Sequence, residues 1–155
     1  MQTLEQIVGE SPAFAGLGPA QLEVVVGCAR TTGFDQGARL FREGEPADDF
    51  YLLRRGRVAL QLRDAARGEL TIETLESGEV VGWSWLFEPY RWHFDAVAIE
   101  DVRAITFDGA CLRGKCAADH DLGYELMRRF AGIAIARLQH TRLRLLDVYG
   151  SGRRG

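Results

Sequence analysis

The chain has 155 residues, of which 46% are hydrophobic and 26% charged, and its formal net charge is −3. One domain of this size buries about 70% of its unfolded surface, and the composition is that of an ordinary globular protein. No apolar run reaches the ~18 residues of a membrane-spanning helix, which argues against a membrane location. The acidic N-terminus lacks the basic segment of a signal peptide, so the sequence predicts a cytoplasmic protein.

Three cysteines, Cys28, Cys111 and Cys116, lie in apolar, helix-like stretches. Their odd number, and a spacing that matches neither a CxxC motif nor a zinc-ligand pattern, favour reduced core thiols. A redox role for Cys111 and Cys116 is the alternative interpretation.

Charge is distributed unevenly along the chain. Residues 1–120 hold 12 basic and 19 acidic residues, whereas residues 121–155 hold seven arginines and three acidic residues. Nucleic-acid binding requires a basic domain or a recognised motif, and neither is present. The final arginines are therefore interpreted as complements to an acidic body.

Residues 1–30 are predicted to form two helices. Thr3 is a suitable N-cap for a first helix over Leu4 to Val8, which the Ser11-Pro12 dipeptide ends. Pro19 occupies the first turn of a second helix, in which apolar residues recur at helical spacing as far as Ala29.

From Thr31 onward the pattern changes to short runs bounded by glycines. Such runs, separated by turns every 8–12 residues or so, are typical of β-sandwiches and barrels. Residues 31–107 are therefore predicted to form a β-barrel, with strands over residues 39–41, 49–53, 57–62, 70–75, 94–100 and 102–107.

The stretch from Gly78 to Ala98 contains all three tryptophans of the chain. Gly78 and Gly82 permit tight turns, and a short helix over Ser84 to Phe87 is predicted to end before Pro89. The free N–H groups at the start of such a helix suit an anion. The alternative is that the aromatic residues only plug the mouth of the barrel.

Residues 108–149 are predicted to form a short helix capped by Asp108 and a long helix from Leu122 to about Tyr149, followed by a frayed tail over residues 150–155. Apolar or small residues of the long helix recur in steps of three and four, which predicts a homodimer through this helix. The dimerisation residues are Met127, Phe130, Ala134, Leu138, Thr141, Leu145 and Val148.

Three segments carry a resemblance to a known family: Gly37 to Phe41, Gly44 to Leu53 and Gly56 to Val58. Their glycine spacing resembles the cyclic-nucleotide-binding domain, the sensory domain of the cyclic AMP receptor protein and other Crp/Fnr-type regulators. The resemblance covers the single domain 1–155. It implies a mainly β fold with flanking helices: a jelly-roll barrel (double-stranded β-helix), two N-terminal helices, a short helix and a long C-terminal dimerisation helix.

In that family the region matching Gly78 to Ala98 is the phosphate-binding cassette. The resemblance implies that Gly82 and the helix start hold a cyclic phosphate, but Trp83 stands where a ribose-binding glutamate is expected. Trp92 stands where a phosphate-binding arginine is expected, with Arg91 one residue early. We therefore expect weak or absent cyclic AMP binding. The candidate ligand-binding residues are Gly82, Trp83, Ser84, Arg91, Trp92, His93 and Thr141.

Thr141 enters this set because the segment around it is similar to one whose threonine reaches the purine across the dimer axis. The alternative is that Thr141 is a polar core residue that fixes helix register. The candidate ligands are a cyclic nucleotide, bound through Arg91 and the Gly82 N–H groups, or an aromatic small molecule stacked on the tryptophans.

Three functions remain open. The first is a ligand-sensing regulatory dimer with an altered cassette, and the second is a ligand-free dimerisation or protein-docking module. A metal, haem or redox sensor is the third. No catalytic constellation is present, and His93, His120 and His140 are scattered, so neither an enzyme nor a metal site is expected. The family's winged helix-turn-helix does not follow the long helix, so no direct DNA binding is expected.

Overall fold

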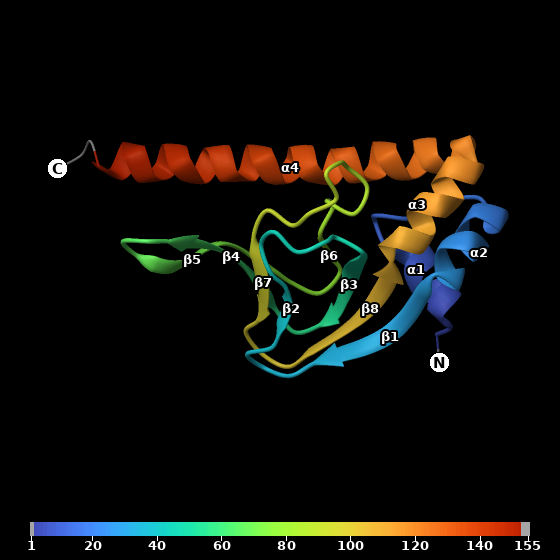
Figure 1. Ribbon diagram of the computed structural model, residues 1–155, viewed down its shortest axis with the longest axis horizontal. Coiled ribbons are helices and arrows are strands. Elements are labelled where there is room, and N and C mark those ends of the chain that lie inside the picture. Colours follow the sequence, from blue (N-terminus) through green and yellow to red (C-terminus); the bar gives the residue numbers. More distant parts are fainter. Residues whose placement is uncertain (1, 153–155) are drawn as a thin grey trace.

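The computed structural model describes residues 2–152, and for residues 148–152 it describes the backbone alone. Two helices precede a set of eight strands, and two more helices follow it (Figure 1). Their bounds are α1 Leu4–Glu10, α2 Pro19–Gly27, β1 Ala29–Phe34, β2 Arg39–Phe41, β3 Asp49–Arg55, β4 Val58–Asp64, β5 Gly68–Leu75, β6 Val80–Val81, β7 Asp95–Ala98, β8 Val102–Asp108, α3 Gly109–Ala118 and α4 His120–Gly152.

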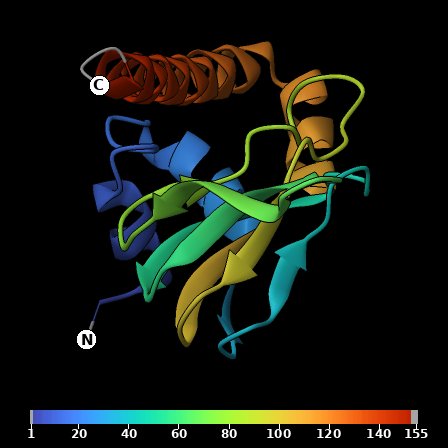
Figure 2. The same cartoon turned by 90° about the vertical axis from the view of Figure 1, so that its left-hand side faces the viewer.

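The strands form two antiparallel sheets of four. One has the order β1-β8-β3-β6 and the other the order β2-β7-β4-β5, so strands far apart in the chain become neighbours. β8 lies between β1 and β3, and its Phe107 is paired with both Ala29 and Phe50. Figure 2 shows the two sheets curving around a shared interior. This arrangement confirms the predicted jelly roll.

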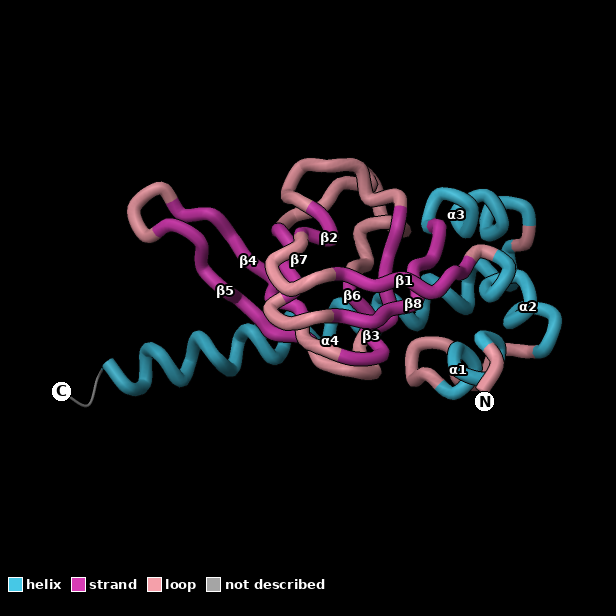
Figure 3. Tube along the Cα trace, turned by 90° about the horizontal axis from the view of Figure 1, so that it is seen from below, coloured by secondary structure: helices cyan, strands magenta, loops and turns pink. Residues whose placement is uncertain are grey.

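The helices lie outside the sheets on two sides. α1, α2 and α3 gather at one end of the barrel, while α4 runs along its side (Figure 1). Figure 3 shows that the C-terminal half of α4 and the β4–β5 hairpin both extend beyond the barrel in the same direction. No helix within the described part of the chain is long and apolar enough to cross a membrane.

Aromatic side chains join the barrel to α4. Phe50 stacks on Phe107 with ring centres 4.6 Å apart and on Trp85 at 4.5 Å. Phe130 of α4 meets Phe50 and Trp85 edge-on, at 5.2 Å and 5.1 Å. Phe14, after α1, lies 5.3 Å from Phe107. Because all five rings are buried, the first part of α4 belongs to the same core as the sheets.

The predicted helix starts are confirmed by their caps. Thr3 forms a capping box with Gln6 at the start of α1, and the Asp108 side chain accepts a hydrogen bond from the N–H of Cys111 in α3. α2 ends at Gly27, earlier than predicted, because β1 already begins at Ala29 and pairs with β8.

Two local predictions were wrong. Residues 84–87 form turns instead of a short helix, with hydrogen bonds from Leu86 N to Trp83 O and from Phe87 N to Ser84 O. The tail was predicted to begin at residue 150, but the helical backbone of α4 continues through Gly152. Residues 153–155 of that tail lie outside the described residues.

Candidate functional site

Within the cassette, the loop that follows β6 begins at Gly82. Its φ of +97° is a conformation that favours glycine. A Cβ built on Gly82 would lie only 2.4 Å from the Trp92 ring. Trp92 is buried, and its ring stacks on Phe41 of β2 with centres 3.8 Å apart and planes 11° apart. The space beside the Gly82 backbone, where the resemblance places a phosphate, is therefore occupied by an indole ring.

Trp83 lies at the boundary between the barrel and α4. Its ring is half-buried and meets Phe94 edge-on, with centres 5.9 Å apart. On the other side the guanidinium of Arg137 lies 5.0 Å from the centre of the Trp83 ring. Arg137 also donates a hydrogen bond to the carbonyl oxygen of Val80. Trp83 thus contacts a cation of α4, in a position where the resemblance places a carboxylate.

Arg137 is half-buried between α4 and the barrel. Burial lowers the pKa of its guanidinium, and the carboxylates of Glu73 and Glu79 oppose that shift. Its Nη1 atom has no protein hydrogen-bond partner. A cation that stands over an indole and has lost much of its water gains more from the ring than an exposed one does. The contact therefore helps to fix α4 on the barrel.

Ser84 and Trp85 occupy the turn that follows. Both are buried, and the Trp85 ring lies between Phe50 and Phe130 in the aromatic core. Since residues 84–87 form no helix, the proposed anion site at a helix start does not exist there.

Arg91 is exposed and points to a different loop. Its Nη1 donates to the carbonyl oxygen of Gly44 at 2.8 Å, and its backbone forms an isolated β-bridge with Pro46. The neighbouring N–H of Trp92 donates to Glu45 O at 3.1 Å. Arg91 therefore links the cassette to the β2–β3 loop.

His93 and Thr141 are both exposed. The Thr141 hydroxyl donates to the carbonyl oxygen of Arg137, one turn earlier in α4, at 3.0 Å. Of the seven candidate ligand residues, the structure thus brings Gly82 and Trp92 into direct contact and places Trp83 against Arg137. Arg91, His93 and Thr141 make their contacts elsewhere or face solvent.

Arg113 of α3 was missed by the sequence analysis. Its Nη1 donates to the carbonyl oxygens of Trp85 at 2.6 Å and Ala47 at 3.0 Å, and its Nη2 contacts Asp48 at 3.1 Å. Its guanidinium also lies 4.5 Å from the centre of the Tyr90 ring. Arg113 therefore clamps the cassette loop to α3. Nothing in the local sequence distinguishes it from a surface arginine, because its partners lie far away in the chain.

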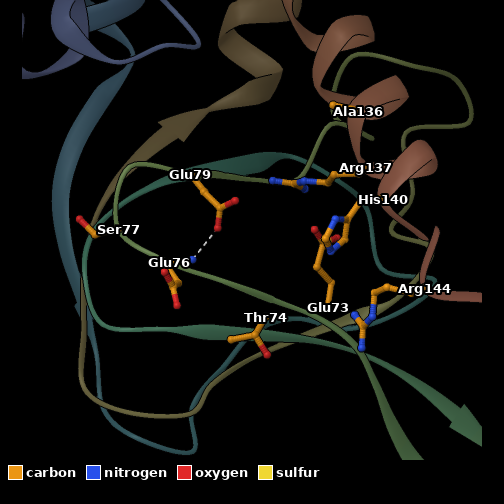
Figure 4. A pocket seen from close by; sticks show the side chains of 9 residues that line it. All are labelled: Glu73, Thr74, Glu76, Ser77, Glu79, Ala136, Arg137, His140 and Arg144. Atoms are coloured by element: carbon orange, nitrogen blue, oxygen red, sulfur yellow. Dashed lines mark hydrogen bonds between the residues drawn. The ribbon is translucent and has the colours of Figure 1, made fainter. Parts of the chain in front are cut away.

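A cleft of about 640 Å³ separates the end of β5 and the β5–β6 turn from α4 (Figure 4). We call it the α4 cleft. Its barrel side carries the carboxylates of Glu73, Glu76 and Glu79, and its helix side carries Arg137, His140 and Arg144. A second cavity of about 310 Å³ adjoins it and shares Glu79, Ala136 and Arg137. The two walls of the α4 cleft thus carry groups of opposite charge.

The side of α4 that faces away from the barrel is apolar. Seven of the eight large apolar side chains exposed among the described residues lie on this helix. They are Tyr124, Met127, Ile135, Leu138, Leu143, Leu145 and Leu146.

Of the predicted dimerisation residues, Met127, Leu138, Thr141 and Leu145 are exposed, and Ala134 is half-buried. The assignment of Phe130 needs correction, because it is fully buried in the chain's own core. Counting back by sevens from Leu145 and Leu138 reaches residue 131, so Phe130 lies one position off the exposed seam. The side chain of Val148 lies outside the described residues.

Within residues 2–152, no three His, Cys, Asp or Glu side chains are grouped so that they could hold a metal ion.

The two sheets, the helices around them and the loop that begins at Gly82 between β6 and β7 define a jelly-roll domain. The model of the family described as "Cyclic nucleotide-binding domain" matches residues 32–119, more than half of the chain. The chain therefore belongs to the cyclic nucleotide-binding domain family, as the glycine spacing predicted.

Two curated relatives are similar over most of the chain. The CRP-like cAMP-activated global transcriptional regulator of Mycobacterium tuberculosis is 26% identical over 145 residues, which make up 94% of this chain and 63% of the relative. The cyclic AMP receptor protein of Thermus thermophilus is 28% identical over 123 residues, which make up 77% of this chain and 57% of the relative. The chain thus spans less than two thirds of the length of either.

Solved structures show the same fold. A Geobacter metallireducens protein superimposes with a TM-score of 0.79 and 30% identity, over 89% of this chain and 99% of the other. A cyclic nucleotide-binding domain from Methylobacillus flagellatus gives a TM-score of 0.77 at 19% identity, over 93% and 81% of the two chains. The second likeness supports the fold alone.

Proposed function

We propose that this chain is a non-enzymatic regulatory domain that acts as a homodimer and does not take cyclic AMP into the barrel. The observation that carries the proposal is the contact between Trp92 and Gly82. A Cβ at Gly82 would already be 2.4 Å from the indole, so a phosphate cannot approach the Gly82 backbone while Trp92 keeps this position. This favours the second function named from the sequence, a ligand-free dimerisation or protein-docking module, in which the aromatic residues fill the pocket.

The charges of the cassette support the same conclusion. Recognition of a cyclic nucleotide needs a carboxylate for the ribose and a guanidinium for the phosphate, and the matching positions hold Trp83 and Trp92. A hydrogen bond to a charged group contributes about 1.5–3 kcal/mol, so loss of the carboxylate alone weakens binding roughly ten- to hundredfold. Arg91 does not replace the arginine here, because its guanidinium is bonded to Gly44 O.

The homodimer rests on the exposed side of α4. Leu138, Thr141 and Leu145 follow one another at the steps of three and four that two parallel helices need to interdigitate. Met127 and Ala134 continue the seam toward the barrel, where they are exposed and half-buried respectively. A second copy of the chain offers the same seam in the same register, which makes it the occupant that fits best.

Calorimetric titration with cyclic AMP and cyclic GMP tests the proposal. We expect no saturable heat below a ligand concentration of about 100 μM, because displacing a buried, stacked tryptophan costs several kcal/mol. A dissociation constant in the low micromolar range for either nucleotide would overturn the proposal and restore the cassette as a cyclic nucleotide site.

The α4 cleft favours a second candidate function, the sensing of a small zwitterion such as a free amino acid. Its two walls carry carboxylates and cationic or titratable groups across a cavity of about 640 Å³. An amino acid would match both walls at once, because its ammonium suits Glu73 or Glu79 and its carboxylate suits Arg144. A thermal-shift screen of amino acids tests this, since a ligand of the folded state raises Tm. Absence of any shift at millimolar concentration would contradict it.

A further inference from the structure

Cys28 and Cys111, which lie 83 positions apart in the chain, meet at the junction of two helices with the barrel. The thiol of Cys28 donates to the sulfur of Cys111, with the two Sγ atoms 3.0 Å apart. Cys28 is the C-cap of α2 and is buried, whereas Cys111 lies in the first turn of α3 and is exposed. The sequence alone does not indicate that these two cysteines are neighbours, because their proximity depends on the pairing of β1 with β8.

The backbone holds both cysteines firmly in place. β1 and β8 pair so that Ala29 lies opposite Phe107, and the N–H of Asp108 donates to the carbonyl oxygen of Cys28 at 2.8 Å. The Asp108 side chain in turn accepts a hydrogen bond from the N–H of Cys111 at 2.9 Å. A short chain of hydrogen bonds therefore connects the two residues, and the closeness of their sulfurs follows from the sheet register.

We propose that Cys28 and Cys111 form a reversible disulfide that locks the first turn of α3 to the end of α2. The bond requires the sulfur atoms to approach by only about 1 Å, from 3.0 Å to the ~2.0 Å of a disulfide. Cys116, the remaining thiol, lies further along α3, is half-buried and has no cysteine partner among the described residues.

A low-molecular-weight disulfide such as oxidised glutathione supplies the oxidising equivalents. The exposed Cys111 thiolate attacks one glutathione sulfur, forms a mixed disulfide and releases one glutathione thiol. The sulfur of Cys28 then attacks Cys111 Sγ, its proton leaves to solvent, and the second glutathione departs. In total two protein thiols are oxidised and one glutathione disulfide is reduced to two thiols.

The two cysteines have different roles in this exchange. Burial and the contact with Cys111 raise the pKa of the Cys28 thiol to about 12, so Cys28 is a poor first nucleophile. Cys111 is accessible to a solution oxidant, and Cys28 is already in contact with the sulfur that it must attack. The order of the two steps therefore follows from the exposure of Cys111 and the burial of Cys28.

The bond would join the junction of α2 with β1 to the junction of β8 with α3. α3 packs against α4, and its Arg113 clamps the cassette loop. A covalent link at the start of α3 restricts the unfolded chain across 83 positions, which stabilises the folded state. For a domain of this size we expect oxidation to raise Tm by roughly 5–10 °C.

The test uses the full chain, reduced and then incubated with oxidised glutathione. Denaturing alkylation and mass spectrometry should show a fall from three free thiols to one, and a non-reducing digest should yield a peptide pair linking residues 28 and 111. Cys116→Ala is the matched control and should keep both the cross-link and the rise in Tm. Cys111→Ala, at an exposed position, should fold and lose both.

Several results would overturn the proposal. One is the retention of three free thiols in the oxidised protein, and another is a cross-link through Cys116 or between two chains. Formation of the 28–111 bond without a rise in Tm would contradict the locking of α3. Cys28→Ala, if it folds, should leave at most a glutathione adduct on Cys111 and therefore no change in the Tm of the oxidised protein.

Discussion

Arg137 of α4 lies over the ring of Trp83, 5.0 Å from its centre, and so joins the long helix to the cassette loop. The same guanidinium donates to Val80 O, in the strand directly before Gly82. Phe130, seven residues earlier, is buried in the barrel core, and Arg144, seven residues later, donates to Ile72 O at 2.5 Å. One side of α4 therefore holds the barrel through an aromatic ring and two guanidinium groups, which leaves the adjacent apolar side available to a partner.

A double-mutant cycle measures the contact between Arg137 and Trp83. We expect Arg137→Met and Trp83→Leu to be coupled by about 1 kcal/mol in the free energy of unfolding, because a partly desolvated cation–π pair contributes on that order. Urea unfolding of the four proteins provides the measurement. Arg144→Met combined with Trp83→Leu is the matched control and should show additive effects. Equal coupling in the two cycles would contradict a specific contact, because it would mean that Trp83 responds to the overall charge of α4 and not to Arg137 in particular.

Gly82→Ala tests the packing of Trp92 in the cassette. The new methyl group would meet the indole at 2.4 Å, and alanine would have to adopt a φ of +97°. The backbone strain costs about 1–2 kcal/mol and the overpacking about 1–3 kcal/mol, so we expect a loss of roughly 2–5 kcal/mol in chemical denaturation.

Gly37→Ala is the control for the backbone term alone. Gly37 has a φ of +90°, and no atom lies within 4 Å of the Cβ position. Gly37→Ala should therefore lower the free energy of unfolding only through backbone strain, by about 1–2 kcal/mol. Similar losses for the two alanine variants would show that Trp92 does not fill the space beside Gly82 in solution.

The sequence predicted the barrel well because its signals are local. Glycine-bounded runs indicated the strands, and caps such as Thr3 and Asp108 indicated helix starts, since each depends on a few neighbouring residues. The heptad steps likewise indicated an apolar side of α4, but they could not show that Phe130 turns into the barrel. That distinction depends on where the helix meets the sheets.

The candidate site was less predictable. The sequence identified Gly82, Trp83 and Trp92 as decisive positions and raised the alternative that aromatic rings plug the pocket. It gave no indication that Arg113 holds the loop or that Arg137 covers Trp83, because each contact joins segments at least 28 positions apart. Arg91 looked like an anion ligand from its position alone, yet its guanidinium is bonded to a carbonyl oxygen of another loop.

Two variants of α4 separate folding from dimerisation. Phe130→Ala empties a site in the core and should lower the free energy of unfolding by about 3–5 kcal/mol. Leu138→Glu with Leu145→Glu changes two exposed positions and should leave the circular dichroism spectrum unchanged while converting a dimer to a monomer in sedimentation velocity. A wild-type protein that sediments as a monomer at micromolar concentration would refute the proposed dimer.

The buried Tyr51 should make the stability of the protein fall at alkaline pH. Burial raises the pKa of its hydroxyl from 10.0 to about 12, with the nearby Asp49 adding to the shift. Between these values the folded state keeps a proton that the unfolded state has lost, so stability falls as the pH rises from about 10 to about 12. Tyr51→Phe also loses the hydrogen bond to Leu40 O, which lowers stability by a constant amount below pH 10.

Urea unfolding at several pH values isolates the Tyr51 contribution. The difference in stability between wild type and Tyr51→Phe should shrink as the pH rises through this window, because only the wild type loses the favourable protonated form. Tyr124→Phe, at an exposed position, is the control. A constant difference between wild type and Tyr51→Phe across the window would show that the hydroxyl is hydrated in the folded protein.

Rebuilding the two altered cassette positions is the strongest test of why the pocket is filled. Trp92→Arg removes the ring that lies against Gly82 and supplies a guanidinium for a phosphate, and Trp83→Glu supplies a carboxylate for a ribose hydroxyl. The new carboxylate would also lie near Arg137, which already sits over position 83, so its charge need not remain unpaired. We therefore expect the double variant to bind cyclic AMP and the wild type not to bind it.

With a Kd of about 10 μM, about 1 mM cyclic AMP would stabilise the double variant by roughly 2.7 kcal/mol, which corresponds to a Tm rise of about 5–10 °C. The acyclic nucleotide 5′-AMP is the ligand control, and each single variant should respond less than the pair. A double variant that shows a native circular dichroism spectrum but no response to cyclic AMP would mean that residues beyond Trp83 and Trp92 close the cassette.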